Sequence, residues 1–318
     1  MSNNAHSIRG YLYIATATFF WGISATMGRA MFTGRLAPGG HPLRTIDPLI
    51  LAQGRTTISL LVLAPILLVQ RGRALALPKK DFLQTVVLGI LGVAASNYLY
   101  YLAIQKTNVA VAIIIQYTAP AWVLLYMVAR GRQRATLQRI ASVGLAVVGC
   151  AMVIGLVGAV HFQVNTVGLL AAVLASFSFA FYNVGGHDIL GRYDRWKVLL
   201  YTLASAAAFW IIVNPPWKIA DAHFGIAEWI FLTVFAITSV LLPFSLYFAG
   251  LQHLDATSAI VASCMEPIFS IVLAAIVLGE RVRPLQTAGI VVVLAAIVLA
   301  QTPERGLREE VAVVEPIE

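Results

Sequence analysis

Long apolar runs separated by short polar gaps dominate this chain. A helix that crosses a hydrocarbon layer about 30 Å thick needs roughly 20 apolar residues. Ten runs approach or exceed that length, at residues 11–33, 48–69, 82–104, 108–129, 136–158, 166–187, 197–213, 228–250, 256–278 and 284–301. The first run is too long for a secretory signal and lacks a small-residue cleavage site. The pattern therefore predicts an all-α integral membrane protein with ten transmembrane helices.

Composition narrows the class further. Hydrophobic residues make up 59% of the 318 positions and charged residues only 11%, whereas soluble chains carry about 25% charged residues. This excludes a soluble enzyme, a disordered chain and a disulfide-rich scaffold. The two cysteines, Cys150 and Cys264, lie in apolar runs, so we expect small buried side chains there.

The distribution of positive charge predicts the orientation. The net charge is +8, but the Lys and Arg residues lie in gaps between apolar runs, which points to cytoplasmic loops and not to nucleic acid. With the N-terminus inside, fourteen of the 22 Lys and Arg residues fall inside, six outside and two within spans. We therefore expect both termini in the cytoplasm and the Val157–Asn165 loop on the outer side.

The chain also contains an internal repeat. The stretch that starts at Ala103 matches the stretch that starts at Gly250, 147 residues later, and the span from Gly10 resembles the span from Gly168. The equivalent pairs include Tyr100 with Tyr247, Gln105 with Gln252, Asn108 with Asp255, Ala112 with Ala259, Ile113 with Ile260, and Pro120 with Pro267. The alternative is chance similarity between apolar runs.

Five spans per repeat is an odd number, so the second half must enter the membrane from the opposite side. Inverted repeats of this kind occur in secondary transporters, which bind substrate near the midplane between the halves. The expected domains are two five-helix repeats, at 10–158 and 166–301. The acidic tail, 302–318, is expected to be cytoplasmic and disordered.

Several motifs resemble one family. They are FFWG at Phe19–Gly22, LAQGRTTISLLVLAP around Arg55, QYTAP at Gln116–Pro120, and the long closing stretch that begins at Met265. Together they resemble the EamA-like family of the drug/metabolite transporter (DMT) superfamily, over nearly the whole chain. The resemblance implies ten helices in a 5+5 inverted repeat around a central cavity, and export of small metabolites by alternating access.

One position departs from the family pattern. The LGER of Leu278–Arg281 has no counterpart after the fourth span, where the chain reads RGRQR at Arg130–Arg134. That loop need not share the role of its equivalent. The family takes amino acids, drugs, nucleotide-linked sugars and other metabolites, so the resemblance does not name the substrate.

Charged residues within the spans are candidates for substrate binding or ion coupling, because charge is costly in the bilayer. Glu266 lies near the midplane and could accept a proton or bind a cationic group; alternatively it holds helices together. Arg55 could bind a carboxylate or phosphate through its planar fork, or stabilise the bundle. Arg29 lies near the outer end of its span and can reach the interface. His187, at the cytoplasmic end of the sixth span, could titrate near neutral pH or simply cap the helix.

Uncharged polar and aromatic residues within the spans complete the candidate site. The proposed substrate-binding residues are Trp21, Asn97, Tyr101, Gln116, Tyr117, Tyr182, Asn183 and Ser263. Such a set suits a zwitterionic or aromatic metabolite, although each side chain could instead make an interhelical hydrogen bond or lie in an interfacial aromatic belt. Pro120 and Pro267 remove backbone donors near mid-membrane, and we expect them to act as hinges.

The remaining motifs bear on energy source and chemistry. The chain has no GxxxxGK[ST] motif, and nothing implies an ATPase subunit. We see no catalytic, metal-binding or nucleotide-binding constellation, so we expect no enzyme and no cofactor. The expected function is a secondary transporter of the inner (plasma) membrane that exports amino acids or related small metabolites. The expected partners are a small-molecule substrate and the lipid bilayer. The alternatives are an importer or exchanger with the same fold, or a membrane-embedded enzyme.

Overall fold

The computed structural model describes residues 2–32, 44, 46–107, 109–154, 165–279 and 281–301. The elements there are helices, with no strand among the described residues: α1 (Ser2–Phe32), α2 (Pro48–Arg71), η2 (Gly72–Leu75), α3 (Lys79–Val87), η3 (Leu88–Ala94), α4 (Ala95–Lys106), α5 (Val109–Gln116), α6 (Ala119–Ala129), α7 (Leu137–Ile154), α8 (Thr166–Leu190), α9 (Arg195–Val213), α10 (Trp217–Asp221), α11 (Ile226–Ala236), η4 (Ile237–Leu241), α12 (Leu242–Leu251), α13 (Ala256–Ser263), α14 (Glu266–Leu278) and α15 (Pro284–Gln301). The tail 302–318 and residues 157–164 of the expected outer loop lie outside the described residues.

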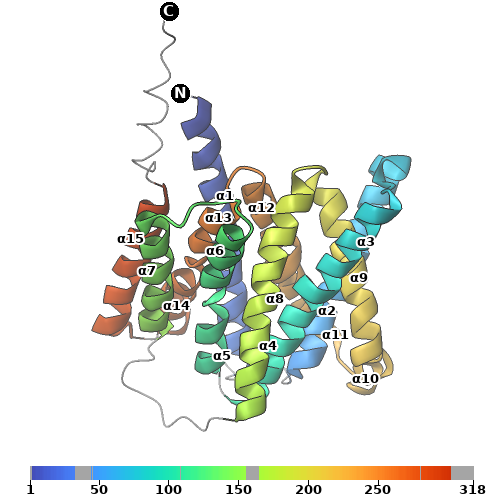
Figure 1. Cartoon of the computed structure of the whole chain (residues 1–318). Coiled ribbons are helices and arrows are strands. Elements are labelled where there is room, and N and C mark those ends of the chain that lie inside the picture. Colours follow the sequence, from blue (N-terminus) through green and yellow to red (C-terminus); the bar gives the residue numbers. More distant parts are fainter. Residues whose placement is uncertain are drawn as a thin grey trace, which may run out of the picture.

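Each of the ten expected spans has a helical counterpart in the structure. Nine helices or joined helices in the described part are long and apolar enough to cross a membrane, and α1, with 31 residues, supplies the tenth. The helices run side by side, and α1 begins at the end of the molecule where α15 finishes (Figure 1). The prediction of an all-α membrane protein with ten transmembrane helices is confirmed.

The helix boundaries in the two halves follow the internal repeat of the sequence. Helices α5 and α13 begin 147 residues apart and end 147 residues apart, and α6 and α14 begin at the same offset. Each repeat also contains a π-helical segment, η3 in the first and η4 in the second, at equivalent positions. Because π-helical turns are rare, their recurrence at one place supports a structural repeat.

Equivalent helices pack in equivalent ways. Helix α4 packs against α8, and α1 packs against α12. A Cβ atom added at Gly168 would lie 2.6 Å from Thr107 Cγ2, and one added at Gly10 would lie 2.6 Å from Leu254 Cγ. These contacts are repeat equivalents, so close approach at glycine is used in both halves, as in other membrane helix pairs. The 5+5 layout follows from this pairing.

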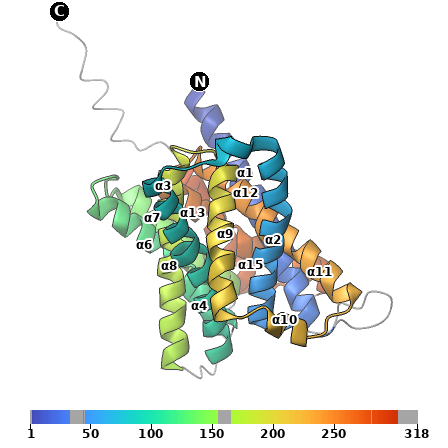
Figure 2. The ribbon, with the colours of Figure 1, turned by 90° about the vertical axis from the view of Figure 1, so that its right-hand side faces the viewer.

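Helices α7 and α15 pack together at one edge of the molecule, whereas α2, α3 and α9 lie at the opposite edge (Figures 1 and 2). A Cβ atom at Gly149 would lie 2.7 Å from Val293 Cγ2, and one at Gly289 would lie 2.6 Å from the backbone nitrogen of Val153. The candidate site draws on α2 at one edge and on helices that lie between the edges, among them α4, α5 and α14 (Figure 1).

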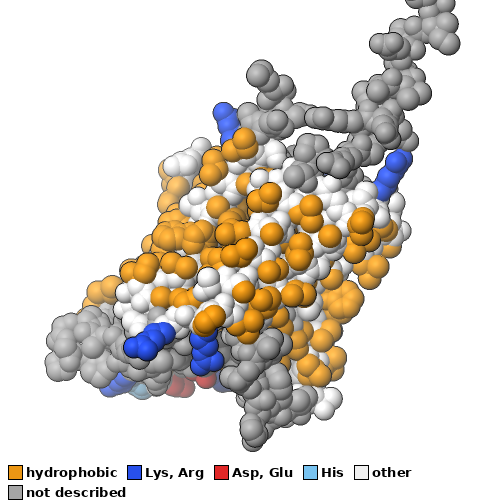
Figure 3. Space-filling model, turned by 90° about the vertical axis from the view of Figure 1, so that its left-hand side faces the viewer, with side chains coloured by type: hydrophobic (Ala, Val, Ile, Leu, Met, Phe, Trp, Pro, Cys, Tyr) orange, Lys and Arg blue, Asp and Glu red, His pale blue; other side chains and the backbone are white. Residues whose placement is uncertain are grey.

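The outer surface suits a lipid environment. Large apolar side chains such as Val148, Ile276 and Val291 are exposed on α7, α14 and α15. Figure 3 shows hydrophobic side chains over most of this face, with Lys and Arg near its two ends. An apolar band bounded by basic residues is the arrangement expected of a multi-pass membrane protein.

Candidate functional site

Two spans are interrupted inside the bundle. The fourth span breaks between α5 and α6 at Tyr117-Thr118, and the ninth breaks between α13 and α14 at Cys264-Met265. Pro120 and Pro267 each occupy the second position of the helix that follows. A proline there removes an N–H that has no intrahelical partner anyway. Each proline therefore begins a new helix and does not kink a continuous one; their role as hinges remains a prediction.

Arg55, on α2, is held beside α4. Its Nη2 donates a hydrogen bond to Asn97 Oδ1, and its guanidinium lies 5.7 Å from the centre of the Tyr101 ring. Asn97 Nδ2 in turn donates to the Val93 carbonyl oxygen at 2.7 Å, which fixes the orientation of the amide. The buried Nε of Arg55 has no hydrogen-bond partner among the described residues, so the guanidinium retains a donor for a ligand.

Glu266 opens α14 at the second helix break. Its carboxylate lies beside the Tyr117 hydroxyl and close enough to Arg55 and Tyr100 for electrostatic interaction. The first turn of a helix favours negative charge. Both Glu266 and Arg55 remain partly accessible. Although both side chains are described, they do not form a direct ion pair, so opposite charges lie near one another without neutralising each other by contact.

A second group of predicted site residues is sealed in this conformation. Trp21, Tyr182, Asn183 and Ser263 are all buried. Asn183 Nδ2 donates to the hydroxyl of Tyr247, and the Trp21 and Tyr247 rings lie 5.4 Å apart. The Tyr182 hydroxyl and Asn183 Oδ1 have no hydrogen-bond partner among the described residues. These side chains pack together around Tyr247, but two of their polar atoms lack a hydrogen-bond partner.

The other candidates occupy different places. Gln116 ends α5 beside the first helix break and is partly exposed, and its carbonyl oxygen accepts a hydrogen bond from Ser176. His187 lies near the C-terminal end of α8, away from the helix breaks. Its neighbour Asp188 pairs with Arg132 at 2.7 Å, and this contact raises the pKa of Arg132. The side chain of Arg29 lies outside the described residues.

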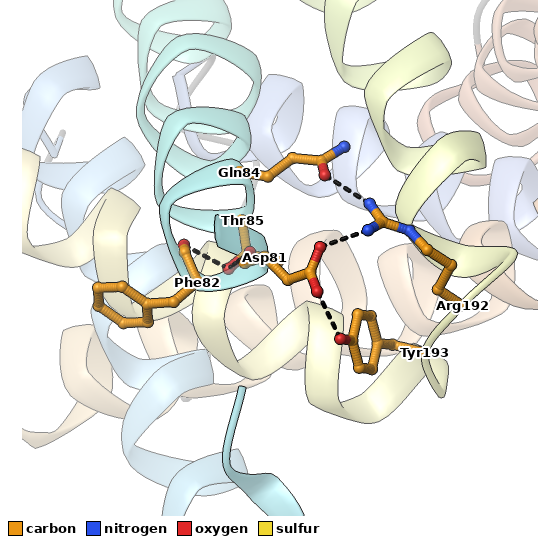
Figure 4. Close-up of polar contacts among 6 residues, drawn as sticks. All are labelled: Asp81, Phe82, Gln84, Thr85, Arg192 and Tyr193. Carbon is orange, nitrogen blue, oxygen red and sulfur yellow. Dashed lines mark hydrogen bonds and ion pairs between the residues drawn. The ribbon is translucent and has the colours of Figure 1, made fainter. Parts of the chain in front are cut away.

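A buried acidic residue was missed by the sequence reasoning. Asp81, in the first turn of α3, accepts hydrogen bonds from Arg192 and, at 2.6 Å, from the Tyr193 hydroxyl (Figure 4). Arg192 also donates to Gln84. The hydrogen bond to Asp81 raises the pKa of Tyr193. In the sequence, Asp81 follows two lysines and resembles a surface residue. It is buried by the packing of α3 against α8 and α9 and by the turn that joins them.

Tyr100 and Tyr247 are the other two residues that the site prediction omitted. Tyr100 lies near Glu266 and Arg55, and Tyr247 is the centre of the sealed group. The signal was present, because the two tyrosines are equivalent in the repeat. The same position in each repeat is therefore a tyrosine, and both tyrosines lie among the candidate site residues.

Comparisons with known proteins agree on the kind of molecule. A sequence model of the EamA-like transporter family matches residues 8–155 and 166–302. The uncharacterised inner membrane transporter YicL of Salmonella typhimurium is 21% identical over 71% of this chain and 75% of its own length. The threonine/homoserine exporter RhtA of Escherichia coli is 27% identical over 81% of this chain and 85% of its own length.

A solved crystal structure shows the same fold. It aligns with a TM-score of 0.72 at 19% sequence identity, and the alignment covers 92% of this chain and 96% of the other. At this identity the likeness concerns the fold alone.

Proposed function

The chain belongs to the EamA-like transporter family, and from that premise we propose that it exports amino acids or related small metabolites from the cytoplasm by alternating access. It is a transmembrane transporter of the drug/metabolite type. The family and the relatives are transporters, which points away from an enzyme. The proposal adds a substrate class and a direction to this coarser assignment.

The proposed substrate class is supported by one observation: Arg55 and Glu266 lie near each other but do not form an ion pair. A zwitterion placed between them would offer its carboxylate to the guanidinium, whose planar donors suit that group, and its ammonium to the carboxylate. Tyr100 lies near both charges, Tyr101 lies against Arg55 and Tyr117 lies beside Glu266, so these tyrosines offer aromatic surface and hydroxyl groups to a ligand. Asn97 and Gln116 complete the proposed substrate-binding set.

The sealed group is proposed to become accessible in the other state of the alternating-access cycle. In alternating access one repeat moves against the other around a central site, here taken as residues 10–158 against 166–301. Such a movement would uncover Trp21, Tyr182, Asn183 and Ser263. The unpartnered Tyr182 hydroxyl and Asn183 Oδ1 support a state in which this group meets substrate or water.

The direction and the orientation rest on separate arguments. Export is supported by RhtA, which is named as an exporter of threonine and homoserine. A cytoplasmic location for both termini is supported by the distribution of Lys and Arg. The inner membrane is supported by the name of the relative YicL. An importer or exchanger would use the same binding geometry.

Counterflow in proteoliposomes tests the proposal. Vesicles that contain the purified protein and an excess of one unlabelled amino acid are diluted into a trace of the same labelled amino acid, across a panel of amino acids and other metabolites. We expect transient accumulation of label for at least one neutral amino acid, and none in protein-free vesicles. Accumulation only of metabolites that lack an amino or a carboxyl group would contradict the proposed substrate class.

A further inference from the structure

Asp81 has an equivalent in the other repeat. Glu228 lies 147 residues later, and the helices that carry the two residues, α3 and α11, also begin 147 residues apart. Each acidic residue lies in the first turn of its helix. Their relative exposures are 8% and 9%, although carboxylates are rarely buried without partners. The inverted repeat places one near each end of the molecule.

The segments that the two carboxylates contact are equivalent as well. Asp81 binds the turn just before α9, whose N-cap is Asp194. Glu228 accepts a hydrogen bond from the backbone nitrogen of Arg44, just before α2, whose N-cap is Asp47. The two N-caps are again 147 residues apart. Each carboxylate therefore reaches from one repeat to the start of a helix in the other.

The two contacts differ in strength. Asp81 is engaged by the guanidinium of Arg192 and by the hydroxyl of Tyr193. Among the described residues, Glu228 accepts only backbone hydrogen bonds, from Gly225 at 2.9 Å and from Arg44 at 3.4 Å. Both carboxylates accept charge-assisted hydrogen bonds, but among the described residues only Asp81 is paired with a positively charged side chain of the other repeat, whereas one backbone hydrogen bond, from Arg44, joins Glu228 to the other repeat.

Further polar contacts reinforce the Asp81 end. They join the connection between α2 and α3 to the start of α9, and they are Arg71 with Asp194, Lys197 with the Ala76 carbonyl oxygen, and Tyr201 with the Leu75 carbonyl oxygen. All of them cross from the first repeat to the second. The expected orientation makes this the cytoplasmic end.

We propose that Asp81 and Glu228 are paired latches that close the cytoplasmic and the outer end of the transport path in alternation. In this structure an ion pair engages the Asp81 latch, whereas among the described residues one long backbone hydrogen bond joins Glu228 to the other repeat, so we take the cytoplasmic end as the closed one. Because the repeats are inverted, exchanging their conformations exchanges the two latches. The inference rests on the alternating access of the proposed function.

Site-directed labelling tests the latches without a substrate. In a background with Cys150→Ala and Cys264→Ala, a reporter cysteine replaces Asn97, and its reaction with an impermeant maleimide is timed in inside-out and right-side-out membrane vesicles. A separate cysteine at Lys218, which is exposed on α10, calibrates the sidedness. The compared variants are Asp81→Asn, Glu228→Gln and, as the control, Asp221→Asn, which removes an exposed acidic residue.

We expect Asp81→Asn to raise the labelling rate from the cytoplasmic side about tenfold or more, because a charged hydrogen-bonded contact is lost. Glu228→Gln should shift the rates in the opposite sense, and Asp221→Asn should leave both unchanged. If Asp81→Asn fails to fold, Tyr193→Phe removes only the hydroxyl and should give a smaller change in the same direction.

Unchanged labelling from both sides in folded Asp81→Asn protein would overturn the latch. So would equal changes in Asp81→Asn and Asp221→Asn. The labelling result does not depend on counterflow. If the protein fails every counterflow trial but shows these opposed shifts in labelling rate, the latch proposal stands and the proposed substrate class is wrong.

Discussion

At the scale of single residues, the asymmetry between the repeats is the main clue to function. Glu266 occupies the position that Ala119 occupies in the other repeat, although α14 and α6 begin at equivalent residues. A fold that required a carboxylate at this position would carry one in both halves. Ala119 is instead fully buried against its neighbours, so the carboxylate serves a purpose that belongs to one half.

Replacing Glu266 with Gln tests that purpose. The change keeps the shape of the side chain and removes its charge, so neither an ammonium group nor a proton can be bound there as before. We expect counterflow to fall about tenfold or more, equivalent to roughly 1.4 kcal/mol of binding free energy, or to lose its dependence on pH. The melting temperature should stay close to that of the wild-type protein.

Ser270→Ala is the matched control for this change. Ser270 lies one turn further along α14, and its hydroxyl donates to the backbone carbonyl of Glu266, so the variant alters the same helix and leaves the carboxylate in place. Wild-type counterflow with an unchanged pH profile in Glu266→Gln would make Glu266 a packing residue.

At the scale of helices, the sequence predicted the spans well and their interruptions poorly. Apolar runs of the right length determine where helices cross the membrane, and the seventh run, the shortest, is a regular helix, α9. The π-helical segments η3 and η4 were not predicted, because a π turn and an α turn place similar apolar side chains in the same run. The prolines marked the breaks, but not that each begins a separate helix.

Glycines in α7 offer a stability test with an internal control. At Gly149 an added Cβ would lie 2.7 Å from Val293 Cγ2 and 2.9 Å from its backbone nitrogen, whereas at Gly144 nothing lies within 4 Å. We expect Gly149→Ala to lower the free energy of unfolding by about 1–3 kcal/mol through overpacking. Gly144→Ala should be neutral or stabilising by up to about 1 kcal/mol, because alanine favours helix.

Thermal unfolding of both variants in detergent measures this difference. A smaller loss for Gly149→Ala than for Gly144→Ala would mean that α7 and α15 do not pack closely there. The same comparison would then count against the edge position assigned to these two helices.

At the scale of the whole molecule, the sequence identified the charged residues but not their proximity. Arg55 and Glu266 lie in different repeats, and their separation depends on how α2, α4 and the two helix breaks pack together. The same limit hid Asp81, whose partner Arg192 is more than a hundred residues away in the sequence. Repeat equivalence predicted Tyr100 and Tyr247 as a pair, and geometry then placed one of them beside Glu266 and the other in the sealed group.

The most direct test of the central claim is competition in counterflow by analogues of one transported neutral amino acid. The analogues lack either the amino group or the carboxyl group and are otherwise the same size. If Arg55 and Glu266 bind the two ends of a zwitterion, each analogue should compete at least about tenfold less well than the intact amino acid, since each leaves one of the two charges without its partner. Equal competition by the intact amino acid and by either analogue would contradict the account.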